Sequence, residues 1–225
     1  MTGSTHPINF DRFNFRLKTA GEFIYQIGLE PCGYLHDLRA SLVLCSDDPK
    51  DSDIVIGTIK GFVADLESAS LEGVSIMDVF DTEQTTMDYF EALYSGDDDW
   101  DSFLPAVIRA AGCDEWVARN LLILDRLEIE PQYRGHRFSL DAMQMFIERF
   151  RMGVGLVALK PFPLQFESSY RGVKNKIKRE TDGLDGFSCT NAQGISKLTK
   201  LYGTLGFKRV PKTGYMVRDA QRSFN

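Results

Sequence analysis

The residues best suited to chemistry form a short polar loop, Gln132 to Arg137, between an apolar run and an amphipathic one. Backbone N–H groups at a helix N-terminus lack partners within the helix and carry partial positive charge. Gly135 would let the chain turn close to a ligand, so that these amides could hold a phosphate. Arg134 and Arg137 would add charge-assisted hydrogen bonds to a pyrophosphate. Taken alone, the loop fits a plain turn better than a phosphate site.

Apolar segments on both sides of the loop would position it. Residues 118–130 are apolar and alternate near their end, which predicts a strand; Pro131 stops it because proline lacks a backbone donor. Apolar residues at helical spacing predict an amphipathic helix over 138–151. The elements expected after it are a buried strand at 154–159, a helix at 195–205 that closes at Gly206, and short strands at 207–210 and 215–217.

The N-terminal half predicts sequential antiparallel strands followed by helices. The elements expected there are strands at 21–29, 34–45 and 53–65, a helical stretch at 75–94, and a second short helix at 103–111 that Pro105 interrupts. Strands and helices in this order predict an α+β fold with a mixed sheet. Because no internal repeat or long linker is present, we expect a single domain over 1–225, with insertions at about 66–117 and 161–194.

Composition excludes several classes of protein. The 225 residues are 43% hydrophobic and 26% charged, as in an ordinary globular domain, which argues against intrinsic disorder. No apolar run approaches the ~18 residues of a membrane span, and because residues 1–12 lack a basic region followed by an apolar stretch, we expect no secretory signal. The four cysteines and three histidines lack zinc-ligand spacing, so we expect free thiols, no metal and a cytoplasmic location.

Charge is unevenly distributed along the chain. Residues 61–115 hold 14 acidic side chains and one basic one, whereas residues 171–222 hold 12 basic and 4 acidic ones. The net charge of −6 argues against nucleic-acid binding. The basic C-terminal third could attract a compact polyanion such as a nucleotide phosphate, or both regions could be solvated faces.

Two motifs, in order around these elements, resemble the GNAT superfamily of acyl-CoA-dependent N-acyltransferases. The superfamily's loop reads Gln or Arg, two residues, Gly, one residue, then Gly or Ala; Gln132 and Gly135 match, and Arg137 departs from the last position. Its late helix often reads Tyr, two residues, Leu-Gly-Phe, as residues 202–207 do. The Asn often found seven residues before that Tyr is Ile195 here.

The resemblance covers about residues 121–217 and implies a GNAT-like sheet with a splayed central parallel pair. It implies acetyl-CoA, or another acyl-CoA, as co-substrate. The strand ending at Glu130 would bond the pantetheine arm through its backbone, and the loop would hold the pyrophosphate. The basic stretch 171–179 is either a site for the ribose phosphate or a solvated face. The cofactor-binding residues implied are Leu127, Ile129, Gln132, Arg134, Gly135, His136, Arg137, Phe138 and Ser139.

Direct attack of an amine on a thioester needs a base for the amine and a proton for the departing thiolate. Tyr202 matches the superfamily's usual Tyr and is the candidate proton donor. For the base, Asp125, Glu128 and Glu130 lie on the key strand, and Glu128 is nearest the expected cleft. A surface role fits each carboxylate equally well, and a water chain could serve instead.

The acceptor would be a primary amine on a small molecule or a protein. The acidic block at 97–101 would favour a cationic one. Two alternatives stay open. The chain could be a CoA-binding but inactive GNAT-like protein that regulates or binds a partner, as Arg137 and the two extra segments suggest. It could also be an unrelated phosphate-binding module.

Overall fold

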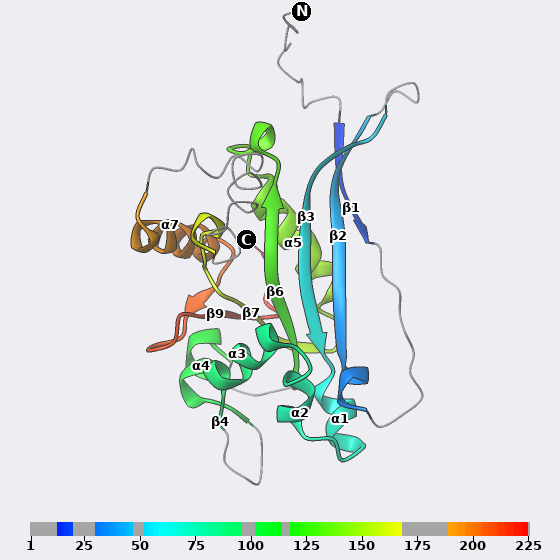
Figure 1. The fold of residues 1–225 in the computed structure, drawn as a ribbon, viewed down its shortest axis with the longest axis vertical. Helices are drawn as coiled ribbons and strands as arrows, with labels where there is room; N and C mark the ends of the chain where they lie inside the picture. The colour runs from blue at the N-terminus through cyan, green and yellow to red at the C-terminus, as the bar shows by residue number, and fades with distance from the viewer. Residues whose placement is uncertain are drawn as a thin grey trace, which may run out of the picture.

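A seven-stranded mixed sheet forms the centre of the protein, with strand order β1-β2-β3-β6-β7-β9-β8 (Figure 1). We describe a computed structural model of residues 13–19, 30–46, 52–95, 102–113, 118–167 and 189–224. Within the sheet β6 and β7 pair in parallel and every other neighbouring pair is antiparallel. The strands are β1 (Phe13–Thr19), β2 (Leu35–Ser46), β3 (Ile54–Ala64), β6 (Asn120–Ile129), β7 (Val154–Leu159), β8 (Lys208–Arg209) and β9 (Met216–Asp219), and β4 (Tyr94–Ser95) pairs with β5 (Ser102–Phe103) as a separate hairpin.

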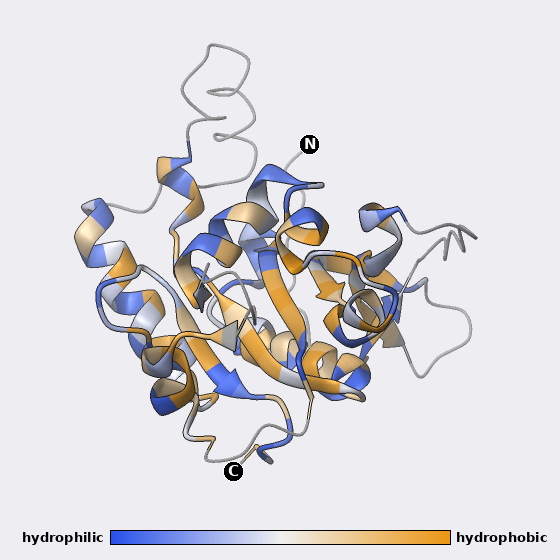
Figure 2. Cartoon of the chain, turned by 90° about the horizontal axis from the view of Figure 1, so that it is seen from below, coloured by the Kyte–Doolittle hydropathy of each residue, from blue (hydrophilic) through white to orange (hydrophobic). Residues whose placement is uncertain are grey.

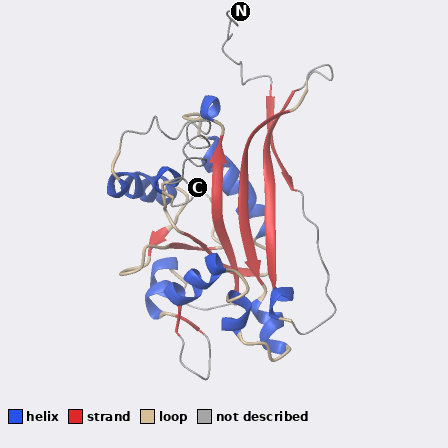
Figure 3. Ribbon diagram, viewed as in Figure 1, coloured by secondary structure: helices blue, strands red, loops and turns tan. Residues whose placement is uncertain are grey.

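Helices lie on both sides of the sheet (Figure 3). They are α1 (Leu66–Leu71), α2 (Ile76–Phe80), α3 (Gln84–Leu93), α4 (Pro105–Ala111), α5 (Phe138–Phe150) and α7 (Asn191–Gly203), with 3₁₀ turns η2 (Pro31–Tyr34), η3 (Pro131–Tyr133) and η4 (Leu164–Phe166). The longest described helices, α5 and α7, have 13 residues each, and no described helix is long and apolar enough to cross a membrane.

Alternation along β6 divides the core between the two faces of the sheet. Leu121 and Ile123 belong to a buried cluster with α1 to α4, whereas Leu122 and Leu124 belong to one with α5. Successive strand residues point to opposite faces, so a strand covered on both faces is a continuous apolar run. Figure 2 shows this band of hydrophobic residues along the central strands. The result is that β6 and β7 are held rigidly where they pair.

A β-bulge interrupts the pairing of β3 with β6. Lys60 lies opposite Arg126 but Gly61 lies opposite Leu124, which leaves Asp125 as an extra residue on β6. A bulge bends its strand and increases the local twist. The two backbones come so close here that a Cβ on Gly61 would lie 2.3 Å from the Ile123 carbonyl oxygen. Only glycine fits this position without backbone movement.

Most of the sequence expectations for the fold are confirmed. The α+β class, the mixed sheet and the splayed parallel pair are present. The strands expected at 34–45, 53–65, 118–130 and 154–159 and the helix at 138–151 correspond to β2, β3, β6, β7 and α5. The strand expected at 21–29 lies outside the described residues. The short terminal strands are present as β8 and β9, with boundaries shifted by one or two residues. Strand β1 and helix α1 were not expected.

Three expectations about helices were wrong in detail. The single helical stretch at 75–94 is two helices, α2 and α3, because the buried Thr86 hydroxyl donates to the Phe80 and Glu83 carbonyls at the break. Pro105 begins α4 rather than interrupting it, since proline suits the first helical position. Helix α7 begins at Asn191, four residues before the expected start, because Thr190 and Gln193 form a capping box.

We expect Gly61→Ala to lower the free energy of unfolding by about 1–3 kcal/mol, because the methyl group would force β3 and β6 apart at the bulge. The matched control is Gly33→Ala, since a Cβ there has no atom within 4 Å. Urea denaturation of both variants measures the difference. Equal unfolding free energies for the two variants would show that the bulge tolerates separation of the strands.

Candidate active site

Strands β6 and β7 separate just beyond the bulge. Their last paired residues are Leu124 and Leu159, after which β6 continues to Ile129 without β7 beside it. In Figure 1, β6 and β7 run in clearly different directions. The hydroxyl of the buried Tyr89 lies 3.5 Å from the Leu124 carbonyl oxygen and also hydrogen-bonds the Lys160 backbone. Tyr89 therefore bridges the two strands at the point where the paired region ends.

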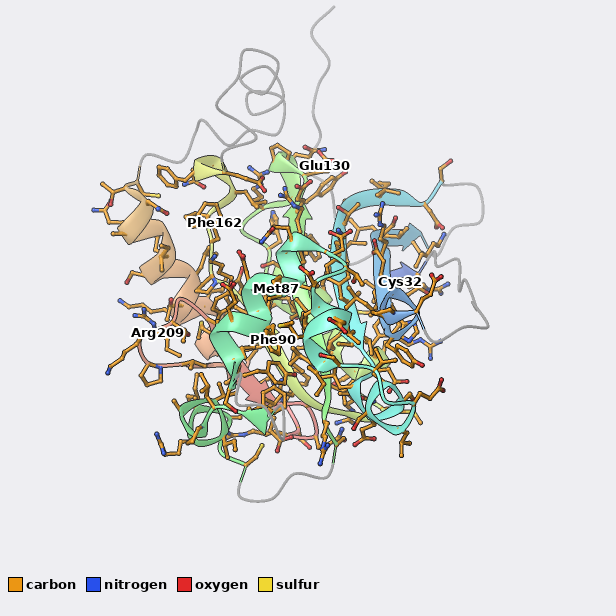
Figure 4. All side chains as sticks on the ribbon, turned by 60° about the horizontal axis from the view of Figure 1, so that its bottom comes forward. Cys32, Met87, Phe90, Glu130, Phe162 and Arg209 are labelled. Atoms are coloured by element: carbon orange, nitrogen blue, oxygen red, sulfur yellow. The ribbon has the colours of Figure 1, made fainter. Side chains whose placement is uncertain are left out.

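A cavity of about 520 Å³ fills the opening beyond this point. The last residues of β6 line one side, residues 162–165 and α7 line the other, and Pro131 with residues 133–139 lines the end. Figure 4 labels two of the residues that line the cavity: Glu130, which follows β6, and Phe162, which lies after the end of β7. The sequence-predicted site residues among its lining are Leu127, Glu128, Ile129, Arg134, Gly135, His136, Arg137, Phe138, Ser139 and Tyr202. Gln132 is not among them and is exposed.

The backbone of β6 presents hydrogen-bonding groups to this cavity. The Glu130 N–H donates to the Ile56 carbonyl on β3 at 2.9 Å. Since antiparallel partners alternate between bonded and non-bonded pairs, Leu127 and Ile129 direct their backbone groups away from β3. The Ile129 carbonyl accepts a hydrogen bond from Arg134 Nε at 2.8 Å. An extended ligand could therefore lie beside β6 as an additional strand.

The loop before α5 holds two residues in left-handed backbone conformation. Gly135 has φ 85°, and Arg137, the residue that caps α5, has φ 61°. No side chain caps the helix, and the first intrahelical bonds are those of the Leu140 and Asp141 amides to the Arg137 carbonyl. Phe138 and Ser139 of the first turn line the cavity, and basic side chains line it beside them. These are Arg134, Arg137 and, from α7, Lys197.

Tyr202 on α7 lines both this cavity and a smaller one beside it. Burial raises the pKa of its phenol to about 12. At neutral pH the hydroxyl is therefore protonated, which is the state that a proton donor needs.

Two carboxylates compete for the role of base. Glu128 lines the large cavity, but its carboxylate lies 2.8 Å from the Arg126 guanidinium, which also pairs with Glu167 after η4. Asp125 is the extra residue of the bulge; its carboxylate is 4.0 Å from Lys60 Nζ. Burial raises the pKa of Asp125, although Lys60 and Arg126 act in the opposite direction. Asp125 also lines the smaller cavity beside Tyr202, which makes it the better placed of the two.

Sequence reasoning ranked Asp125 below Glu128 because the strand pattern alone does not show a bulge. A bulge shifts by one residue which side chains point to each face. Gly61 opposite the bulge is its only sequence signal, and a glycine in a strand is ambiguous. Lys197 and Cys189 also line the large cavity and were not predicted. The acidic block at 97–101 and the basic stretch at 171–179 lie outside the described residues.

Comparisons with family models, with curated proteins and with solved structures found no match for this chain. Within the described part of the chain, no group of three or more His, Cys, Asp or Glu residues is placed to hold a metal ion.

The left-handed conformation of Arg137 predicts that replacement by glycine leaves a more stable protein than replacement by alanine. Both Arg137→Gly and Arg137→Ala lose the 3.5 Å ion pair with Asp141, but only glycine adopts φ 61° without strain. We expect the glycine variant to be more stable than the alanine variant by about 1 kcal/mol in urea denaturation. A more stable alanine variant would contradict the assigned backbone conformation.

The raised pKa of Asp125 predicts a stability cost for its charge. Because the folded pKa lies above the usual aspartate value of 3.8, the penalty is complete above the folded pKa and vanishes as pH falls below 3.8. Asp125→Asn should therefore unfold at higher urea concentration than the wild type at pH 7, and the gain should disappear toward pH 3.5.

The control for this measurement is Asp53→Asn, because hydrogen bonding to Lys18 lowers the pKa of Asp53. That variant should lose rather than gain stability at pH 7. A loss of stability at pH 7 in Asp125→Asn would contradict the desolvated environment assigned to Asp125.

Proposed function

We propose that this protein is an N-acyltransferase that moves an acyl group, acetyl above all, from acyl-CoA to a primary amine in a ternary complex. The observation that carries the proposal is the opening between β6 and β7. It joins a β6 backbone edge, a glycine-containing loop at a helix N-terminus and the half-buried Tyr202 around one cavity. Gly135 and Tyr202, which belong to the two GNAT-like motifs of the sequence, both line this cavity. We also propose that the protein is cytoplasmic.

Binding of acyl-CoA would use groups that the cavity already presents. The pantetheine amides would bond the backbone of Leu127 and Ile129, which would release the Ile129 carbonyl from Arg134. Arg134 would then be available to the diphosphate, together with the first-turn amides of α5 and Arg137. This exchange keeps the Ile129 carbonyl hydrogen-bonded both with and without the ligand.

The chemical step would transfer two protons. The amine nitrogen forms a bond to the thioester carbonyl carbon while Asp125, or Glu128 in its place, accepts a proton from the nitrogen. The carbon–sulfur bond then breaks, and Tyr202 donates its phenolic proton to the CoA thiolate. The products are an amide and CoA, and the proton taken by the carboxylate can return to the tyrosinate through solvent.

The first test is calorimetry with acetyl-CoA and, separately, with ATP. We expect acetyl-CoA to bind in the micromolar range and ATP to give no heat. Gly135→Trp should abolish acetyl-CoA binding, because Gly135 has φ 85° and lines the cavity. The matched control is Gly73→Trp, a glycine with φ 75° that lies outside the cavity, and it should bind normally. Failure of the wild type to bind acetyl-CoA would overturn the proposal.

Turnover on a panel of primary amines then separates the enzyme from a non-catalytic CoA-binding protein. Tyr202→Phe should lower kcat about 100-fold or more and leave acetyl-CoA binding nearly unchanged. Wild-type binding of acetyl-CoA without turnover of any amine would favour a regulatory protein instead.

A further inference from the structure

A second, smaller cavity adjoins the large one where β6 and β7 separate. Its volume is about 50 Å³, and it shares Leu127, Phe162, Leu164 and Tyr202 with the large cavity. The large cavity thus leads into the small one, and Tyr202, the candidate proton donor, lies where they meet.

The inner part of the small cavity is closed by side chains from four elements. Ile59 of β3, Met143 of α5 and Leu159 of β7 are each 2% exposed, and Leu124 of β6 is 7% exposed. All four belong to the buried cluster that packs β6 against α5. The polar part of the lining comes from Asp125, Arg126 and Lys160. A ligand group in this cavity would have apolar contacts at one end and the candidate base beside it.

The volume limits what fits. A single water occupies about 10–15 Å³, so a cavity of about 50 Å³ has room for only a few groups of that size, roughly three to five. An acetyl group has three heavy atoms and a butyryl group five, whereas an octanoyl group has nine. Since a closed, well-packed core resists overfilling, longer chains would not enter without displacement of Met143 or its neighbours.

We infer that the small cavity is the acyl site and that it selects short acyl chains of about two to four carbons, with Met143 as the residue that sets the limit. The inference rests on the proposed function, because it assumes that the thioester reaches the junction of the two cavities. Met143 sets the limit because its unbranched side chain, buried on α5, lines the cavity, and its truncation would enlarge the space.

The test is a series of calorimetric titrations with CoA, acetyl-, propionyl-, butyryl-, hexanoyl- and octanoyl-CoA on the wild type. We expect the first four to bind within a few-fold of one another and octanoyl-CoA to bind about tenfold more weakly or worse. Octanoyl-CoA that binds as tightly as acetyl-CoA would overturn the acyl-site inference and leave the proposed function intact. Absence of binding by both CoA and acetyl-CoA would overturn the two together.

A variant pair identifies the residue that sets the limit. Met143→Ala should recover hexanoyl-CoA binding at least several-fold relative to acetyl-CoA. Ile147→Ala is the control, because Ile147 is a fully buried residue of the same helix and cluster that does not line the cavity. It should keep the wild-type order of affinities. Equal shifts in the two variants would show general loosening of the core and would contradict a limit set by Met143.

Discussion

The bulge at Asp125 is the constraint on which the rest of the site depends. Strand β6 is held on both sides up to Leu124, by β3 and by β7, and both faces of it are buried there. The extra residue bends the strand at that point, so β6 stays with β3 and leaves β7. Gly61 permits the close approach that the bend requires, and the Tyr89 hydroxyl bonds both strands at the end of the pairing.

The cavity, its backbone edge and its two candidate proton-transfer groups follow from this bend. Without separation of the strands, Leu127 and Ile129 would pair with β7 and present nothing to a ligand. The same bulge residue also supplies the partly desolvated carboxylate near Tyr202. Strain and burial of charge reduce stability, and both occur here at the site, in the left-handed Arg137 and in Asp125. This is the expected distribution when a rigid core supports a reactive cleft.

The sequence predicts the scaffold of the site better than its details. Continuous apolar runs identify β6 and β7, because strands buried on both faces carry apolar residues at every position. The apolar face of residues 138–151 identifies α5, because residues buried on one face of a helix recur at the helical spacing. The placement of Asp125 beside Tyr202 could not be predicted, since a bulge changes which face a side chain points to without changing composition. Gln132 matches the motif but does not line the cavity, which the motif alone does not reveal. The break between α2 and α3 depends on one threonine hydroxyl, which no periodicity reveals.

Residue-resolved hydrogen exchange with and without acetyl-CoA tests the central claim most directly, namely that a ligand lies along β6 where β7 has left it. The account predicts slower exchange of the Leu127 and Ile129 amides on addition of acetyl-CoA. The amides of Glu128 and Glu130 face β3, where Glu130 already donates to Ile56, and they should be unaffected. Protection that falls equally on all four amides, or on none of them while acetyl-CoA binds elsewhere, would contradict the account.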